Sequence, residues 1–260
     1  MNYETIIYEE ADNHVATITL NRPEAMNSFN ARMREEFRDV WRRVKENDDV
    51  HAVVLRAAPG RAFSTGLDVK EGYAQPANFW HSEDPGTALC PKANKVWKPV
   101  ICAVHGMLAG GAFYWLNGAD LVICSEDAEF FDPHVTYGQT AVLEPIGLRF
   151  KIPLHEVLRM VLMGNDERIS AQTALRISLV SEVVELDRLW ARAEEIAAGI
   201  AAKPAASMQG SVRAIWESLD ATRTAALDRG MQYTQLGNPV GKAQVDRDAL
   251  MKAPKKFQVR

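Results

Sequence analysis

The sequence HGMLAGGAF, residues 105–113, follows the apolar run VICAV at 100–104, which predicts a buried strand that leads into a glycine-rich turn and a short helix. A Gly-Gly pair at the start of a helix leaves backbone N–H groups free and lets a ligand approach the chain closely. A second loop, RAFSTGLDVK at 61–70, follows another predicted buried strand at 50–57. When two such N–H groups converge from separate loops, they form an oxyanion hole that stabilises charge on a carbonyl oxygen.

The segments around these loops alternate between strand and helix patterns. Residues 14–20 (HVATITL) and 120–124 (DLVIC) read as strands, and apolar residues recur at helical spacing over 31–45, with Asn30 as the predicted N-cap. Another helix is expected before Lys98–Pro99. This alternation predicts an α/β architecture with mostly parallel sheets.

The last third of the chain changes character. Ser170 is a predicted cap for a helix over 171–177, and residues 186–202 form a long amphipathic pattern. After Lys203–Pro204 the pattern is helical throughout. We therefore expect an α/β core over residues 1–195 and a helical C-terminal region over residues 196–260.

Composition excludes several classes of protein. Asp and Glu (34) outnumber Lys and Arg (30), which argues against a nucleic-acid binder. The three cysteines form no CxxC or Cys/His cluster, so neither a disulfide scaffold nor a metal site is expected. The N-terminal residues lack the pattern of a signal peptide, and no apolar run reaches membrane-spanning length. The expectation is a cytoplasmic protein with no membrane partner.

Several further segments match one family pattern together with the two loops. They are NRPEAMNSF (21–29), RAFSTGLDVKE (61–71), KPVICAVHGMLAGGA (98–112), ADLVIC (119–124) and ISAQTALRISLVSEVV (169–184). With them the chain resembles the crotonase (enoyl-CoA hydratase/isomerase) superfamily nearly from end to end. The resemblance implies a crotonase-type β/α spiral with a C-terminal helical trimerisation region. It also implies an acyl-CoA substrate and no separate cofactor, because coenzyme A enters as part of the substrate.

The resemblance also assigns roles to individual residues. The oxyanion N–H donors would be those of Leu67 and Gly111. The residues implied to contact substrate or coenzyme A are Glu24, Ala25, Met26, Ser64, Thr65, Gly66, Asp68, Gly110, Trp80 and His81. Trp80 and His81 belong to the segment that borders the acyl group in the family, and Trp80 with Phe79 suggests a bulky or hydrophobic substrate.

The two glutamates that the family's hydratases use fall on Tyr114 and His134 in this sequence. Histidine titrates near neutral pH and is suited to act as a general base. It needs a partner that fixes its tautomer, and Glu144 is the expected partner, with Asp132 a turn residue or a supporting one. The His134–Glu144 pattern is partly similar to the β-diketone hydrolase branch of the superfamily (6-oxocamphor hydrolase-like). Tyr114 is the third catalytic candidate, with lining the acyl site as its other role.

Three functions remain open at this point. The first is a lyase or hydrolase that acts on an acyl-CoA thioester through the backbone oxyanion hole with non-standard acid/base residues. The second is a C–C bond hydrolase of a cyclic β-diketone, and the third is a non-catalytic acyl-CoA-binding protein. A homotrimer or hexamer is expected, because the C-terminal helices carry more apolar residues than they can bury alone. These include Ile215, Trp216, Leu219, Leu227 and Met231.

Overall fold

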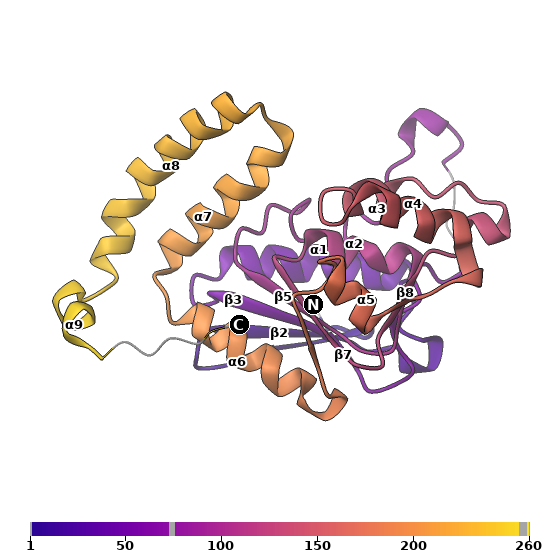
Figure 1. The fold of residues 1–260 in the computed structure, drawn as a ribbon, viewed down its shortest axis with the longest axis horizontal. Coiled ribbons are helices and arrows are strands. Elements are labelled where there is room, and N and C mark those ends of the chain that lie inside the picture. The colour runs from indigo at the N-terminus through magenta and orange to yellow at the C-terminus, as the bar shows by residue number, and fades with distance from the viewer. Residues whose placement is uncertain (1, 73–75, 255–258, 260) are drawn as a thin grey trace. The chain divides into compact units, whose positions relative to one another are not determined.

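The computed structural model describes residues 2–72, 76–254 and 259, and its centre is a six-stranded sheet (Figure 1). The sheet order is β1-β2-β3-β5-β7-β10. The strands are β1 (Ile6–Glu10), β2 (Val15–Leu20), β3 (Ala52–Ala57), β5 (Val100–Val104), β7 (Leu121–Ser125) and β10 (Glu182–Val184). Only β1 pairs antiparallel, with β2, and the other pairs in this sheet are parallel. The predicted α/β class is confirmed.

The sheet is buried on both faces, as its nearly continuous apolar strands require. In β3, Val53 and Leu55 point into one core and Ala52 and Val54 into the other, because successive side chains in a strand alternate between faces. Helix α1 (Ala31–Glu46) covers the first face and helix α6 (Leu189–Ala201) covers the second. The sheet therefore holds its strand ends, and the loops that follow them, on a rigid base.

A second, four-stranded sheet carries the two glycine-containing loops. Its strands are β4 (Ala62–Ser64), β6 (Met107–Ala109), β8 (Glu129–Phe131) and β9 (Ile169–Ser170), in that order. The helices α2 (Phe113–Gly118), α3 (Leu143–Leu148), α4 (Leu154–Met163) and α5 (Ala171–Arg176) complete this part of the chain. Two- and three-residue strands are too short to show a period in sequence, which is why none of these four was predicted.

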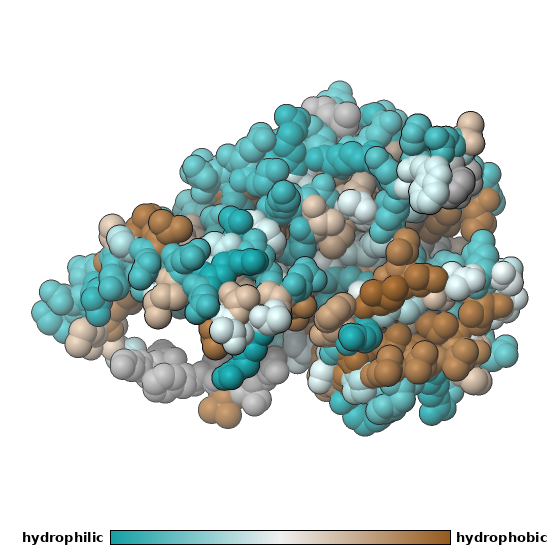
Figure 2. Space-filling model, turned by 90° about the horizontal axis from the view of Figure 1, so that it is seen from above, coloured by the Kyte–Doolittle hydropathy of each residue, from teal (hydrophilic) through white to brown (hydrophobic). Residues whose placement is uncertain are grey.

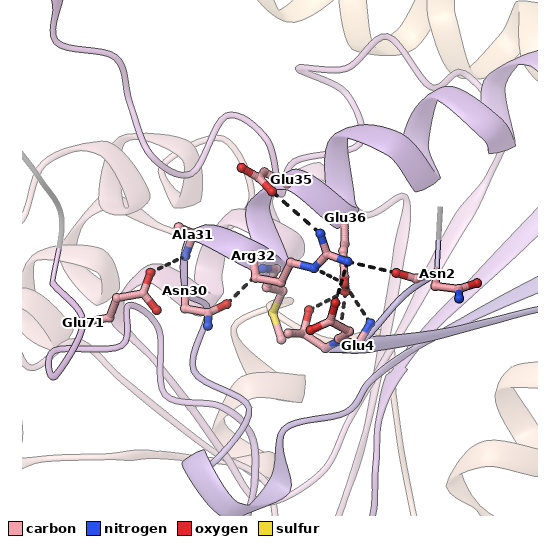
Figure 3. A network of polar contacts seen from close by, with 10 residues as sticks. Asn2, Glu4, Asn30, Ala31, Arg32, Glu35, Glu36 and Glu71 are labelled. Carbon is pink, nitrogen blue, oxygen red and sulfur yellow. Dashed lines mark hydrogen bonds and ion pairs between the residues drawn. The ribbon is translucent and has the colours of Figure 1, made fainter.

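The start of α1 is fixed by polar contacts (Figure 3). Asn30 is the N-cap, as predicted: its side-chain oxygen accepts a hydrogen bond from the Met33 N–H at 2.9 Å. The Glu71 carboxylate accepts from the Ala31 N–H at 2.9 Å. Because Glu71 ends the loop that begins at β4, this bond ties that loop to the first turn of α1.

In the same turn, an ion pair joins α1 to the residues just before strand β1. Arg32 lies 2.9 Å from the fully buried Glu36 and 2.9 Å from Glu4. Glu36 in turn accepts hydrogen bonds from the N–H groups of Glu4 and Thr5. The buried carboxylate is thus paired and hydrogen-bonded, which is the condition for burying a charge without a large penalty.

The helix expected before Lys98–Pro99 is absent. Residues 85–89 and 91–95 form hydrogen-bonded turns instead. Pro91 interrupts the segment, and the Asn94 side-chain amide donates to the carbonyls of Thr87, Ala88 and Cys90. These side-chain bonds satisfy carbonyls that an α-helix would pair with backbone N–H groups.

The contacts divide the chain into two compact units, residues 1–201 and 202–260. The expected boundary at 195 falls inside α6, whose residues Leu189, Ala193, Ala197 and Ala201 all pack in the second core. The second unit contains helices α7 (Ala205–Glu217), α8 (Arg223–Ala243) and α9 (Arg247–Lys252). Among the described residues, none of the helices combines the length and the apolarity needed to cross a membrane.

Helix α5 begins at its predicted cap and ends on a strained residue. The Ser170 hydroxyl accepts from the Thr173 N–H. At the other end the N–H groups of Ser178 and Leu179 donate to the carbonyls of Leu175 and Ala174, which is the Schellman pattern. Ser178 takes a φ of 66° there, in the left-handed region that favours glycine.

Replacing the exposed Ser178 with glycine is expected to raise the free energy of unfolding by about 0.5–1 kcal/mol, because it removes the Cβ penalty of the left-handed conformation. Urea denaturation of the whole chain measures this change. Ser178→Ala is the control, since alanine keeps the Cβ. Equal or lower stability of Ser178→Gly would contradict the account.

Candidate active site

The two glycine-containing loops meet at Gly66 and Gly111. Gly66 has a φ of 84°, and a Cβ on it would lie 2.7 Å from the Gly111 backbone nitrogen. A Cβ on Gly111 would lie 3.4 Å from the Leu67 nitrogen. Such close approach of backbone to backbone requires glycine. The structure therefore brings together the segments that carry both predicted oxyanion donors, Leu67 and Gly111.

The backbone around Leu67 leaves its N–H out of the local pairing. The Gly66 carbonyl accepts from the Phe29 N–H at 2.8 Å, and the Asp68 N–H donates to the Phe29 carbonyl at 2.9 Å. Gly111 lies in the single 3-10 turn Gly110–Ala112 that opens α2, where the first N–H groups have no partner within the helix. The predicted donors, the N–H groups of Leu67 and Gly111, thus lie at positions where regular backbone pairing leaves an N–H group free.

The segment expected to contact coenzyme A packs against the first loop. Pro23–Ala25 is a 3-10 turn, and Met26 and Asn27 follow with φ of 51° and 50°. The buried Asn27 side chain accepts from the Arg22 N–H at 2.8 Å and donates to the Ala62 carbonyl at 3.0 Å. The Thr65 N–H donates to the Met26 carbonyl at 3.2 Å. The structure thereby places Met26 next to Thr65, with Glu24 and Ala25 in the 3-10 turn that precedes it.

Two of the predicted binding residues have structural partners. The Asp68 carboxylate forms an ion pair with Arg22 at 3.0 Å and accepts from the Lys70 N–H. Burial acts to raise the pKa of Asp68. The hydrogen bonds from Arg22 and from the backbone N–H groups of Lys70 and Glu71 outweigh burial and hold the pKa below its usual range. The buried Ser64 hydroxyl accepts from the Gly66 N–H at 3.2 Å. Asp68 and Ser64 fix the loop's shape.

His134 lies beside the second loop, in the 3-10 turn His134–Tyr137. Its Cε1 atom is 3.5 Å from the position that a Cβ on Gly110 would take. Its Nδ1 atom is 2.6 Å from the Asp132 carboxylate, and its backbone N–H donates to the same oxygen at 3.0 Å. The ring is therefore held at Nδ1, which leaves Nε2 as the free nitrogen.

The prediction that Glu144 pairs with His134 is wrong, because Asp132 is the group bonded to His134 Nδ1. Asp132 precedes His134 by two residues across Pro133, so one carboxylate oxygen reaches both the backbone N–H and the ring. Asp132 is fully buried, and its second oxygen has no hydrogen-bond partner among the described residues. The hydrogen bond to Asp132 raises the pKa of His134 above its ordinary value despite partial burial.

Glu144 is buried on helix α3, at 8 % exposure, opposite α2. Its backbone carbonyl accepts from the Asn117 side-chain amide of α2 at 2.9 Å. Burial raises the pKa of Glu144, and the nearby His134 opposes that rise only in part. The pKa of Glu144 and the pKa of His134 are thus both raised, the first by burial and the second by the hydrogen bond to Asp132.

Tyr114 is also buried, at 8 % exposure, one helical turn beyond the glycine pair. Burial and the nearby Asp84 carboxylate raise the pKa of the phenol. A Cβ on Gly86 would overlap the Tyr114 ring at 2.1 Å. The segment Asp84–Gly86 therefore packs against the ring, a contact that sequence reasoning missed. Because its pKa is raised, the Tyr114 phenol stays protonated at neutral pH.

The remaining predicted residues, Trp80 and His81, are not brought into this group. They lie in the 3-10 turn Phe79–His81, and Trp80 is 79 % exposed. The residue of this segment that packs against Tyr114 is Gly86, and its signal in sequence is the Asp-Pro-Gly turn at 84–86. Within residues 2–72, 76–254 and 259, no three His, Cys, Asp or Glu side chains are grouped to hold a metal ion.

Comparison with known proteins identifies the class that this fold and site define. The family model of enoyl-CoA hydratase/isomerase matches residues 10–244, so the chain belongs to that family. Among curated proteins it is 34% identical over 232 residues to (E)-benzylidenesuccinyl-CoA hydratase of Thauera aromatica, with 87% of each chain covered. It is 27% identical over 241 residues to 1,2-epoxyphenylacetyl-CoA isomerase of Escherichia coli, covering 88% of this chain and 89% of the other.

Solved structures agree with this assignment. An enoyl-CoA hydratase/isomerase from Mycobacterium paratuberculosis superimposes with a TM-score of 0.83 at 35% identity. The match covers 96% of this chain and 94% of the other. The chain thus has the crotonase fold, and acyl-CoA thioesters are the substrates of its family.

Proposed function

We propose that this protein is a hydratase of 2-enoyl-CoA thioesters. The thioester carbonyl would accept hydrogen bonds from the N–H groups of Leu67 and Gly111, which stabilise the enolate oxygen as it forms. What supports this placement is the approach of Gly66 to the Gly111 nitrogen, since it brings the two donor segments side by side.

His134 and Glu144 would carry the two proton transfers. His134 Nε2 takes a proton from water while the water oxygen bonds to the β-carbon, and the π electrons pass to the enolate. Protonated Glu144 then gives its proton to the α-carbon, and the carbonyl re-forms. The product is a 3-hydroxyacyl-CoA, and the proton on His134 returns through solvent to Glu144 for the next turnover.

The observation that carries this proposal is the Asp132–His134 contact of 2.6 Å. A carboxylate at Nδ1 fixes the tautomer that leaves Nε2 able to accept a proton, and it stabilises the imidazolium that forms. By the family resemblance, hydratases place a glutamate at the position of His134. An Asp–His pair supplies the same proton acceptor with a different charge.

A panel of trans-2-enoyl-CoA esters, incubated with the protein and followed by mass spectrometry, tests the proposal. The expected result is a product heavier by one water, with heavy oxygen incorporated from labelled water. The same samples should include free cyclic β-diketones. Diketone cleavage without enoyl-CoA turnover would identify a C–C bond hydrolase, and acyl-CoA binding without any turnover would identify a binding protein.

We also propose that the protein assembles as a trimer or hexamer. Ile215, Leu227 and Met231 are exposed on α7 and α8, within the C-terminal unit, around a groove of about 540 Å³. Separately, hydrophobic side chains gather over α3 and α4 in the first unit (Figure 2), including Ile146, Leu158 and Leu162. Apolar surface of this extent is typical of subunit contacts. A stable monomer at micromolar concentration in sedimentation equilibrium would overturn this expectation.

A further inference from the structure

The backbone of Phe29 is paired with the loop that carries the first proposed oxyanion donor. Its N–H donates to the Gly66 carbonyl at 2.8 Å, and its carbonyl accepts from the Asp68 N–H at 2.9 Å, so Phe29 and Leu67 form a parallel bridge. The Gly66 carbonyl and the Leu67 N–H belong to one planar trans peptide and point in opposite directions. The bond from Phe29 to Gly66 therefore directs the Leu67 N–H away from the Phe29 backbone.

The ring of Phe29 lies against the second donor segment. A Cβ on Gly111 would lie 2.7 Å from Phe29 Cε1 and 3.0 Å from Phe29 Cζ, so the edge of the ring contacts the glycine. The next nearest atom to that Cβ position is the Leu67 nitrogen, at 3.4 Å. The Phe29 ring and the first donor thus border the same side of Gly111.

A second contact holds the ring in this place. Phe29 is 1 % exposed, and it meets the fully buried Trp115 edge to face, with ring centroids 6.0 Å apart. This is a favourable arrangement for two aromatic rings. Trp115 lies on α2, the helix that the turn containing Gly111 opens. The Phe29 side chain therefore contacts the second donor segment and the helix that follows it.

We infer that Phe29 is a positioning residue that holds the two oxyanion donors at their working separation and direction. Its backbone fixes the Leu67 peptide and its ring supports Gly111, so it acts through these donors. An oxyanion hole requires each donor about 2.7–3.1 Å from the oxygen, so a small displacement of one donor weakens it. The inference rests on the proposed function only in placing the thioester carbonyl against Leu67 and Gly111.

Phe29→Leu separates the role of the ring from that of the backbone. Leucine keeps an apolar side chain and the backbone bonds, but it lacks the ring atoms that meet Gly111. Isotope-edited infrared spectroscopy of butanoyl-CoA labelled with carbon-13 at the thioester carbonyl measures the donors directly, because hydrogen bonds to a carbonyl lower its stretching frequency. We expect binding to the parent protein to lower this frequency, and we expect a smaller shift in Phe29→Leu.

Kinetics and calorimetry give a second readout for the same variant. The value of kcat/KM on the best enoyl-CoA of the panel should fall on the order of tenfold, a part of the hundredfold or more that loss of a whole donor costs. The Kd of butanoyl-CoA should change less than kcat/KM, because the donors bind the developing enolate more strongly than the ground-state carbonyl.

Phe37→Leu is the matched control. Phe37 is also fully buried and meets the same Trp115 ring, with centroids 5.3 Å apart, but its backbone belongs to α1. Its replacement removes a ring from the same core and should leave the infrared shift unchanged. Phe29→Met keeps more of the side-chain volume and is the second variant where Phe29→Leu does not fold. Its flexible chain should also reduce the shift.

The outcomes separate this inference from the proposed function. A shift in Phe29→Leu as large as that in the parent would overturn the inference alone. Equal losses in Phe29→Leu and Phe37→Leu would also overturn it, because the cause would then be a general packing defect. A shift that is present in the parent and reduced in Phe29→Leu, without hydration of any 2-enoyl-CoA, would contradict only the proposed function. A parent that shows no shift would overturn both.

Discussion

Replacement of His134 with alanine is expected to lower kcat on 2-enoyl-CoA on the order of a hundredfold or more, the usual contribution of a positioned acid–base group. Acyl-CoA affinity should remain nearly unchanged, because the oxyanion donors come from the backbone of Leu67 and Gly111. Steady-state kinetics and calorimetry measure the two quantities separately. His155→Ala, at an exposed position on α4, is the control and should behave as the parent.

The pH profile distinguishes a base from a structural histidine. His134 must be neutral to accept a proton, and its pKa is raised by the hydrogen bond to Asp132. Activity should therefore rise with pH as His134 loses its proton, at a pH above the ordinary histidine pKa of about 6.5, and fall again as Glu144 ionises. Asp132→Asn removes the charge that supports the imidazolium. The rise of activity with pH should therefore move to lower pH, and kcat should fall.

Other outcomes would reassign the chemistry. Full activity of His134→Ala beside an inactive Tyr114→Phe would move proton transfer to Tyr114. A pH limb that does not move in Asp132→Asn would show that Asp132 merely shapes the turn. Glu144→Gln should also lower kcat, because the amide has no proton to give to the α-carbon.

Replacement of Gly66 with alanine is expected to lower kcat/KM on the order of a hundredfold to a thousandfold, the scale for loss of one oxyanion donor. The new Cβ would lie 2.7 Å from the Gly111 nitrogen and 2.9 Å from the Ala109 carbonyl oxygen, and both are backbone atoms. The two donor segments must separate to relieve that contact. Kinetics on the best enoyl-CoA of the panel measure the loss.

Gly72→Ala is the matched control for backbone strain. Gly72 has a φ of 70°, close to the 84° of Gly66, but a Cβ there would meet nothing within 4 Å. Both variants therefore carry a similar strain of roughly 1–2 kcal/mol, and the contact with Gly111 belongs to Gly66 alone. Equal activity of Gly66→Ala and Gly72→Ala would argue against a role for these donors. If Gly66→Ala does not fold, Gly111→Ala provides a second test, since its Cβ would press on the Phe29 ring at 2.7 Å.

The sequence by itself determined the parts of this protein that depend on local pattern. Apolar runs gave the central strands β2, β3, β5 and β7, and helical spacing with a capping side chain gave the first turn of α1 at Asn30. The glycines of the two loops indicated free backbone N–H groups, and the family motifs singled out His134. Each of these features is a property of a few consecutive residues, so their order along the chain is sufficient to find them.

Only the tertiary structure decided which residues meet at the site. Gly86 packs against Tyr114, which is distant in sequence, through a turn whose path no periodicity indicates. Glu144 was the predicted partner of His134, and Asp132 was predicted only as a turn or supporting residue. Because the backbone turns at Pro133, the Asp132 carboxylate is the group that bonds to His134 Nδ1. Glu144 is instead buried on α3. Hydrogen bonding and burial depend on distances of a few ångströms between segments, and packing of the whole domain fixes those distances.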